Sequence, residues 1–202
     1  MKLFHSPASP FVRKVMVLLH EARATDRVTL VPASGTPLDP GTMPVDRNPL
    51  GKIPALERPD GPTLYDSRVI TRYLDDLLQA HLYPAAPRLW DSLVLEATGD
   101  GIAEAAVLMR YEMHVRPEAF RFPDWADAQW GKIARALAAV EERWMSHLSG
   151  PPDMGQIAIG CALGYLDLRH PGRVWRADHP ALAAWYATFA DRPAMRATAP
   201  EV

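Results

Sequence analysis

Hydrophobic residues follow different patterns in the two parts of the chain. Up to about residue 80 the apolar runs are short and broken by proline, and ten of the 20 prolines lie between Pro7 and Pro62. Beyond Leu89 the apolar positions recur at helical spacing over long stretches. The pattern predicts an α/β domain over residues 1–81 and an all-helical domain over residues 88–202, with the proline-stiffened linker Tyr83–Pro87 between them.

The N-terminal part predicts elements in the order β-α-β-β-β-α. Strands are predicted at 2–5 and 27–31, on either side of a helix that begins at Ser9-Pro10, an N-cap residue followed by proline. A strand, helix and strand of this length make a parallel βαβ unit. Residues 54–57 and 63–65 predict a hairpin, and Asp66-Ser67 opens a further helix. The inward face of that helix is predicted to carry Ile70, Tyr73, Leu74, Leu77 and Leu78.

The C-terminal part predicts four helices and needs no strand. The second is predicted around residues 133–148, and the last follows Pro180. Ahead of the third, over 156–169, Asp153 and Gln156 form a capping-box pattern, with an acidic cap and a glutamine three residues on. The first of the four is predicted to bury one stripe of residues, which comprises Leu89, Leu93, Ala97, Gly101, Ala105 and Leu108.

Charge and composition narrow the classes of function. Lys and Arg number 22 against 24 Asp and Glu, a net charge of −2, so the sequence predicts no basic surface for nucleic acid. Its apolar stretches are too short to cross a membrane. Cys161 is the only cysteine, which excludes an internal disulfide and favours a reducing cytoplasm. The seven histidines show no metal-ligand spacing, so no metal site is predicted.

Three motifs in the first 70 residues carry a resemblance to a known family. They are Ser6-Pro7-Ala8-Ser9-Pro10-Phe11-Val12-Arg13-Lys14-Val15, Asn48-Pro49-Leu50-Gly51-Lys52-Ile53-Pro54-Ala55-Leu56 and Tyr65-Asp66-Ser67-Arg68-Val69-Ile70. In this order and spacing they resemble the glutathione transferase family, in particular bacterial serine-type members related to the theta, zeta and omega classes. The resemblance covers essentially the whole chain. It implies a thioredoxin-like N-terminal domain (βαβ-ββα) followed by an all-helical C-terminal domain.

The first motif implies the catalytic residue. By resemblance, the Ser9 hydroxyl donates a hydrogen bond to the glutathione thiolate, with Phe11 beside it, and Ser6 is the alternative residue for this role. A helix N-terminus favours an anion at this position. The alternative for Ser9 is that it only caps the helix, a role worth about 1 kcal/mol. Omega-like relatives carry a reactive cysteine where this chain has Ser9, so thiol-transferase activity is not expected.

The other two motifs imply the rest of a glutathione site. The resemblance implies a cis peptide bond at Ile53-Pro54, with the Ile53 backbone pairing with the cysteinyl part of glutathione. A plain edge-strand proline is the alternative. Lys52 is a candidate for the glycyl carboxylate or simply a surface lysine. Asp66 and Ser67 begin a helix and are implied to hold the γ-glutamyl end, unless they serve only as an N-cap pair.

The resemblance implies a cytoplasmic detoxification enzyme that activates glutathione for attack on a small hydrophobic electrophile. Glutathione is the co-substrate, no metal or nucleotide is implied, and a homodimer is expected through the helices that begin near Asp66 and Leu89. The alternatives are a non-catalytic binding protein of the same fold and a glutathione-dependent isomerase or dehalogenase. The electrophile pocket is predicted to include Met109, Tyr111, His114 and Trp175, although such residues at helical spacing are more often core.

Overall fold

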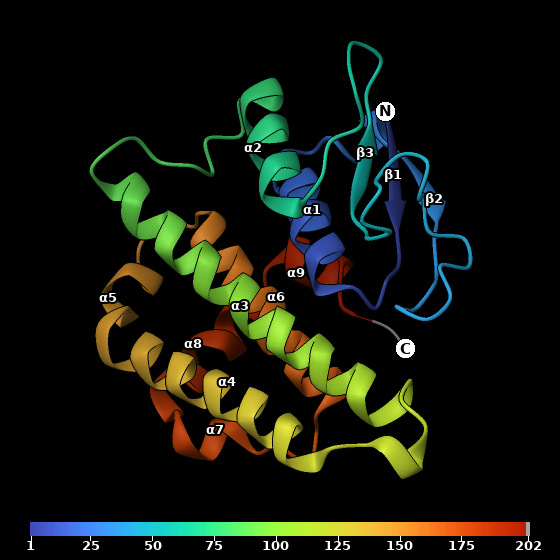
Figure 1. Ribbon diagram of the computed structural model, residues 1–202. Coiled ribbons are helices and arrows are strands. Elements are labelled where there is room, and N and C mark those ends of the chain that lie inside the picture. Colours follow the sequence, from blue (N-terminus) through green and yellow to red (C-terminus); the bar gives the residue numbers. More distant parts are fainter. Residues whose placement is uncertain (201–202) are drawn as a thin grey trace.

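The computed structural model describes residues 1–200 of the chain, so the last two residues of the predicted 88–202 domain lie outside the described residues. Figure 1 shows a small sheet with two helices on one side of it, packed on a larger group of helices. This is the α/β plus all-α architecture that the sequence predicts.

The sheet has three strands, β1 (Lys2–His5), β2 (Thr29–Pro32) and β3 (Ala55–Glu57), in the order β2-β1-β3. β1 pairs with β2 in parallel, as a βαβ unit requires, and with β3 in an antiparallel manner. The helices on this sheet are α1 (Pro10–Glu21) and α2 (Ser67–Leu78). The second strand of the predicted hairpin is reduced to one bridge, in which Leu64 and Leu56 exchange two hydrogen bonds of 2.9 Å.

The second part consists of helices and short connections, with no strand among its described residues, 88–200. Its helices are α3 (Arg88–His114), α4 (Pro123–Arg143), α5 (Met145–Leu148), α6 (Met154–Arg169), α7 (Trp175–Asp178), α8 (Pro180–Ala190) and α9 (Pro193–Ala197). Short 3-10 turns occupy 25–27 and 118–120. Among the described helices, none is both long and apolar enough to cross a membrane.

Helix α6 is the centre of the helical part, because it is buried on every side from Met154 to Leu166. The predicted capping box at its start is confirmed. The Gln156 N–H donates to the Asp153 carboxylate at 3.1 Å, and the Asp153 N–H donates to the Gln156 side-chain oxygen at 3.3 Å. These two bonds satisfy groups that would otherwise be left unpaired at a buried helix end.

The predicted buried stripe of α3 is only partly correct, since Ala105 is buried and Leu89 and Leu93 are half-buried. Ala97, Gly101 and Leu108 are exposed, and the buried face instead carries the polar residues Ser92, Glu96 and Asp100 among small and apolar ones. Leu77 on α2 is also exposed rather than inward. The error on α3 has a physical reason: the buried face is occupied by charges that find partners inside the protein, so apolar spacing does not mark it.

Glycines allow α3 and α6 to approach closely. A Cβ on Gly99 would lie 2.6 Å from the Ala158 carbonyl carbon, and one on Gly155 would lie 2.7 Å from the Ser92 carbonyl oxygen. Because these contacts are with the backbone of the other helix, no side-chain rotation can relieve them. The two helices therefore pack at a separation that only glycine permits at these positions.

Replacing Gly99 with Ala is expected to destabilise the protein by about 1–3 kcal/mol, because the new methyl group forces α3 away from α6. Denaturant unfolding measures the change. Gly101→Ala, two residues further along the same helix, is the matched control. Its Cβ would meet nothing within 4 Å, so it is expected to stabilise the helix by about 0.5–1 kcal/mol. Equal effects of the two substitutions would show that the close approach of the helices does not matter for stability.

Candidate active site

The register of the sheet brings the three sequence motifs to one end of it. Phe4 is paired with Ala55 in an antiparallel manner, so the chain beyond Phe4 and the chain before Ala55 leave the same end of the sheet. The bridge between Leu56 and Leu64 brings the start of α2 to that end as well. Ser9, Pro54 and Ser67 therefore follow or precede adjacent strand ends, although they are far apart in the sequence.

Ser9 caps α1, and this cap leaves its proton available. The Ser9 hydroxyl oxygen accepts a hydrogen bond from the Val12 N–H at 3.3 Å, and its own N–H donates to the Ser6 carbonyl at 3.1 Å. A hydroxyl has one donor and two acceptor positions. The cap uses one acceptor position, so the O–H can still donate to an anion placed before the helix. Ser6, the alternative residue, and Phe11 are half-buried in the same turn.

The peptide bond between Ile53 and Pro54 is cis, as predicted. Within residues 1–200, neither the N–H nor the C=O of Ile53 has a hydrogen-bond partner. The preceding turn is held by buried Asn48, which donates to the Lys52 carbonyl at 2.8 Å and accepts from the Leu50 N–H at 3.1 Å. The N–H and C=O of Ile53 are thus free to pair with a ligand, and the hydrogen bonds of Asn48 fix the backbone that carries them. The Lys52 side chain is exposed beside it.

Asp66 and Ser67 stand at the start of α2. Asp66 is the N-cap and accepts from the Arg68 N–H at 3.0 Å, while its carboxylate pairs with the Arg68 guanidinium at 2.7 Å. Partial burial would raise the pKa of Asp66, but the hydrogen bonds and charge of Arg68 outweigh it, so the pKa is lowered and the side chain stays ionised. Ser67 is buried, and its hydroxyl has no hydrogen-bond partner in the described chain.

A buried charge network lies beneath this end of the sheet. Lys14 on α1 is 1% exposed, and its ammonium contacts Glu96 at 3.0 Å and Asp100 at 2.8 Å, both on α3. Arg68 reaches from α2 to within 3.8 Å of Asp100. Burial raises the pKa of Asp100 despite the opposing effect of the Lys14 charge. The network connects the N-terminal halves of α1 and α2, close to the predicted site residues, to the helical part.

The network also includes the linker. The Tyr83 hydroxyl contacts the Glu96 carboxylate at 2.9 Å and the Thr71 hydroxyl at 2.8 Å. Burial, together with the nearby Glu96 charge, raises the pKa of Tyr83, so it remains a neutral donor. Sequence reasoning missed this network. The signal that could have indicated it is the spacing of Ser92, Glu96 and Asp100, which puts three polar residues on one helical face.

Two of the four residues predicted for an electrophile pocket line one cavity. Met109 and His114, near the end of α3, border a cavity of about 360 Å³ with residues from α4 and from the end of α6. Tyr111 is half-buried on the same stretch of α3. Trp175 does not line this cavity. It is buried in the helical core, and its indole N–H donates to Asp167 at 3.0 Å.

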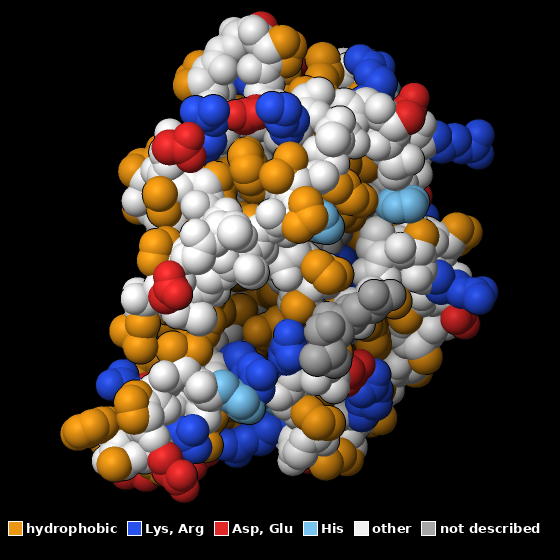
Figure 2. All heavy atoms as spheres, turned by 90° about the vertical axis from the view of Figure 1, so that its right-hand side faces the viewer, with side chains coloured by type: hydrophobic (Ala, Val, Ile, Leu, Met, Phe, Trp, Pro, Cys, Tyr) orange, Lys and Arg blue, Asp and Glu red, His pale blue; other side chains and the backbone are white. Residues whose placement is uncertain are grey.

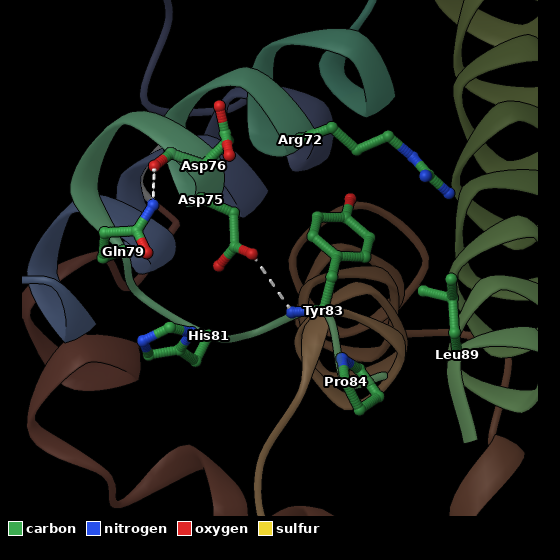
Figure 3. Close-up of a pocket in the computed structure, with 8 residues that line it drawn as sticks. All are labelled: Arg72, Asp75, Asp76, Gln79, His81, Tyr83, Pro84 and Leu89. Carbon is green, nitrogen blue, oxygen red and sulfur yellow. Dashed lines mark hydrogen bonds between the residues drawn. The ribbon is translucent and has the colours of Figure 1, made fainter. Parts of the chain in front are cut away.

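A second cavity, of about 280 Å³, lies at the linker between the two parts (Figure 3). None of the predicted site residues borders it. Asp75 accepts a hydrogen bond from the Leu82 N–H at 2.7 Å, and Arg72 lies over the Tyr83 ring at 4.9 Å. These polar groups hold the linker against α2. The described residues contain no group of three or more metal-binding side chains.

A thioredoxin-like half with a cis-proline turn, followed by a helical half, is the fold of the glutathione S-transferases. Residues 8–77 match the glutathione S-transferase N-terminal domain, and residues 123–188 match its C-terminal domain. The chain belongs to the glutathione S-transferase family. It is 32% identical to the "Uncharacterized GST-like protein YibF" of Escherichia coli K12, a match covering 99% of this chain and 98% of YibF.

Solved structures agree with this membership. A glutathione transferase family member from Pseudomonas fluorescens Pf-5, solved with bound glutathione, is 48% identical, with a TM-score of 0.94 over 100% of this chain and 99% of that one. The same family member was also solved with bound S-(propanoic acid)-glutathione, and that structure gives a TM-score of 0.90 over 100% of both chains.

Proposed function

We propose that this protein is a glutathione transferase that activates the glutathione thiol for attack on a small hydrophobic electrophile. The observation that carries the proposal is the free Ile53 backbone before the cis-proline, adjacent to two helix starts. A tripeptide with an extended backbone and anionic ends needs a peptide-pairing edge and helix N-termini. The Pseudomonas fluorescens relative, which binds glutathione, supports the same assignment.

In the proposed complex each part of glutathione has a partner. Ile53 pairs with the cysteinyl backbone, Ser67 and the N–H groups of α2 hold the γ-glutamyl carboxylate, and Asp66 accepts from the α-amino group. Lys52 is exposed close to Ile53 and serves the glycyl carboxylate. The thiol then lies before α1, where the Ser9 hydroxyl can donate to it.

The proposed chemistry is nucleophilic attack by the thiolate. In substitution, a carbon–sulfur bond forms as the leaving group departs with its electron pair. In conjugate addition, the same bond forms and the resulting carbanion takes a proton from water. Ser9 acts by making thiolate the main species at neutral pH, and the site acts further by holding the two reactants together.

Calorimetry with glutathione, followed by turnover of a generic aryl halide, tests the proposal. We expect a dissociation constant below about 1 mM, as is usual for enzyme substrates, and release of halide above the uncatalysed rate. Absence of glutathione binding would reject the proposal. Binding without turnover would favour a non-catalytic protein of this fold. Mass spectrometry of the products would reveal an isomerase or dehalogenase, since their final product lacks the conjugate.

We also infer a cytoplasmic homodimer. Trp90, Val94 and Leu108 form an exposed apolar stripe on α3, and Val69 and Leu77 are exposed apolar residues on α2. Contiguous exposed apolar residues mark protein interfaces, and we propose that these two helices, which follow one another in the chain, carry such a patch. Sedimentation of the wild type and of Trp90→Glu tests this inference, which requires a dimer for the wild type and a smaller species for the variant.

A further inference from the structure

The cavity at the ends of α3 and α6 is unusually basic. Its lining includes Arg110, Arg169 and Arg173 with His114 and His170, against a single acidic residue, Asp127. The protein as a whole carries slightly more acidic than basic residues, so this concentration is local. Figure 2, a view of the right-hand side of Figure 1, shows Lys, Arg and His side chains on the lower half of this face, below a hollow lined with hydrophobic side chains and with some acidic side chains at the edges.

Two of the three arginines have no acidic partner among residues 1–200. Arg173 forms an ion pair with Asp127 and lies over the Trp130 ring at 5.5 Å. Arg110 and Arg169 make no ion pair within residues 1–200, although both are half-buried. Two unpaired guanidinium groups in one partly enclosed cavity produce a positive field that a bound anion would neutralise.

The neighbouring polar groups do not supply that anion. Burial lowers the pKa of His170, and the charges of Arg173 and Arg110 lower it further, so His170 is neutral and its Nε2 donates to the Ala106 carbonyl at 2.9 Å. Burial raises the pKa of Tyr165, which lies beside Arg169, to about 12, so its hydroxyl remains protonated. Apart from Asp127, which is paired with Arg173, the charged and titratable groups that border the cavity are therefore cations and neutral donors.

The rest of the lining is apolar. Met109 and Met113 from α3 and Pro123 and Ala126 from α4 border the same space. A volume of about 360 Å³ admits a small organic molecule rather than a polymer. The lining fits a ligand with a short apolar body and one anionic end, and guanidinium groups match the planar fork of a carboxylate.

The cavity lies on the side of the molecule where α1 begins. Lys14, in the second turn of α1, bonds to Asp100 on α3, and a side chain on Gly164 of α6 would contact Arg13. From these contacts α3 continues by about 15 Å to Arg110, and α6 by about 7.5 Å to Arg169, at 1.5 Å per residue. Figure 1 shows α1 beginning at its lower end, toward the last turns of α3.

We propose that Arg110 and Arg169 bind a carboxylate of the second substrate, so that the preferred electrophile is a small apolar molecule with an acid group. This inference rests on the proposed function and specifies its substrate class. The two arginines determine which electrophile is preferred, whereas Ser9 activates the glutathione thiol. A carboxylate on the electrophile also remains on the conjugate, so the product is recognised by the same pair.

Two glutathione conjugates that differ only in charge test the inference. Calorimetry on the full chain compares S-(2-carboxyethyl)glutathione with its neutral amide, S-(2-carbamoylethyl)glutathione. The acid is expected to bind about tenfold or more tightly, because the charged oxygens bond to guanidinium groups. Arg110→Gln and Arg169→Gln are each expected to remove most of that preference and leave the affinity for glutathione itself unchanged. Arg143→Gln, an exposed arginine paired with Glu142 on α4, is the control and is expected to keep the preference.

The outcomes separate this inference from the proposed function. Equal binding of acid and amide, with normal binding of glutathione, would overturn the inference and leave the transferase proposal standing. A preference for the acid that survives both arginine substitutions would also overturn it, because the carboxylate would then be bound elsewhere. Failure of glutathione itself to bind would reject both proposals together.

Discussion

Replacing Lys14 with Met is expected to lower the free energy of unfolding by about 3–5 kcal/mol, because it leaves two buried carboxylates without their cation. Glu96 and Asp100 are 2% and 6% exposed, so water cannot replace the lost ammonium. Denaturant unfolding at neutral pH measures the loss. Lys132→Met, which removes an exposed lysine bonded only to Gln129, is expected to change stability by less than about 0.5 kcal/mol.

The stability of the Lys14→Met variant is also expected to depend on pH differently from that of the wild type. Burial raises the pKa of Asp100 and the Lys14 charge opposes that rise, so without the cation the folded-state pKa of Asp100 rises further and the folded state binds protons more tightly. The variant therefore gains stability relative to the wild type as the pH falls, and its deficit is largest at neutral pH and above. A deficit independent of pH would mean that the lost packing of the lysine stem, and not its charge, causes the effect. Adding Glu96→Gln and Asp100→Asn to the variant should recover part of the loss.

Replacing Ser9 with Ala is expected to raise the pKa of the bound glutathione thiol by about one to two units, because one hydrogen bond to the charged sulfur is lost. At neutral pH a thiol with a pKa of about 8.5 is only about 3% ionised, so the thiolate fraction, and with it the conjugation rate, should fall about ten- to twenty-five-fold. Ultraviolet absorbance of the thiolate, titrated with pH, measures the pKa directly. Ser6→Ala, in the same turn, should leave that titration unchanged; the opposite result would assign the role to Ser6.

The cap and the proposed catalytic role of Ser9 can be separated. Ser9→Asp preserves an acceptor for the Val12 N–H, so helix α1 keeps its cap and stability should remain close to that of the wild type. Its carboxylate cannot donate a proton and repels the thiolate, so activity should be lost. Ser9→Ala, in contrast, loses about 1 kcal/mol of stability together with activity. If Ser9→Asp keeps its activity, the hydroxyl serves only as a cap.

Local signals in the sequence predicted much of the fold. The capping box at Asp153 and Gln156 and the proline at the start of α1 are each set by a few neighbouring residues. The cap positions of Ser9 and Asp66 were predictable for the same reason. Ser9 and Asp66 are both candidate site residues and helix caps. Predicting where the helices begin therefore also predicted where these site residues lie. The cis bond before Pro54 was instead predicted from the family resemblance.

Long-range pairing is what the sequence did not reveal. The spacing of polar residues on α3 marks a face, but it does not show that Lys14, 82 residues before Glu96, supplies the counter-charge that allows this face to be buried. The basic cavity was missed for a similar reason, since its arginines come from helices that are distant in the sequence. The hairpin at 54–65 was overestimated because prolines and glycine around residue 60 limit the pairing to one bridge.

The cation of the first helix and its two counter-ions belong to opposite halves of the molecule. Separating the two halves would leave buried charges in each half without their ion-pair partners. Both halves are therefore expected to unfold together as one cooperative unit. A chimaera that joins this α/β half to the helical half of another transferase would need a matching acid pair at the junction. Recombination between such genes within the linker is therefore limited by the need to keep the lysine and its two acids together, even though the linker itself would tolerate a crossover.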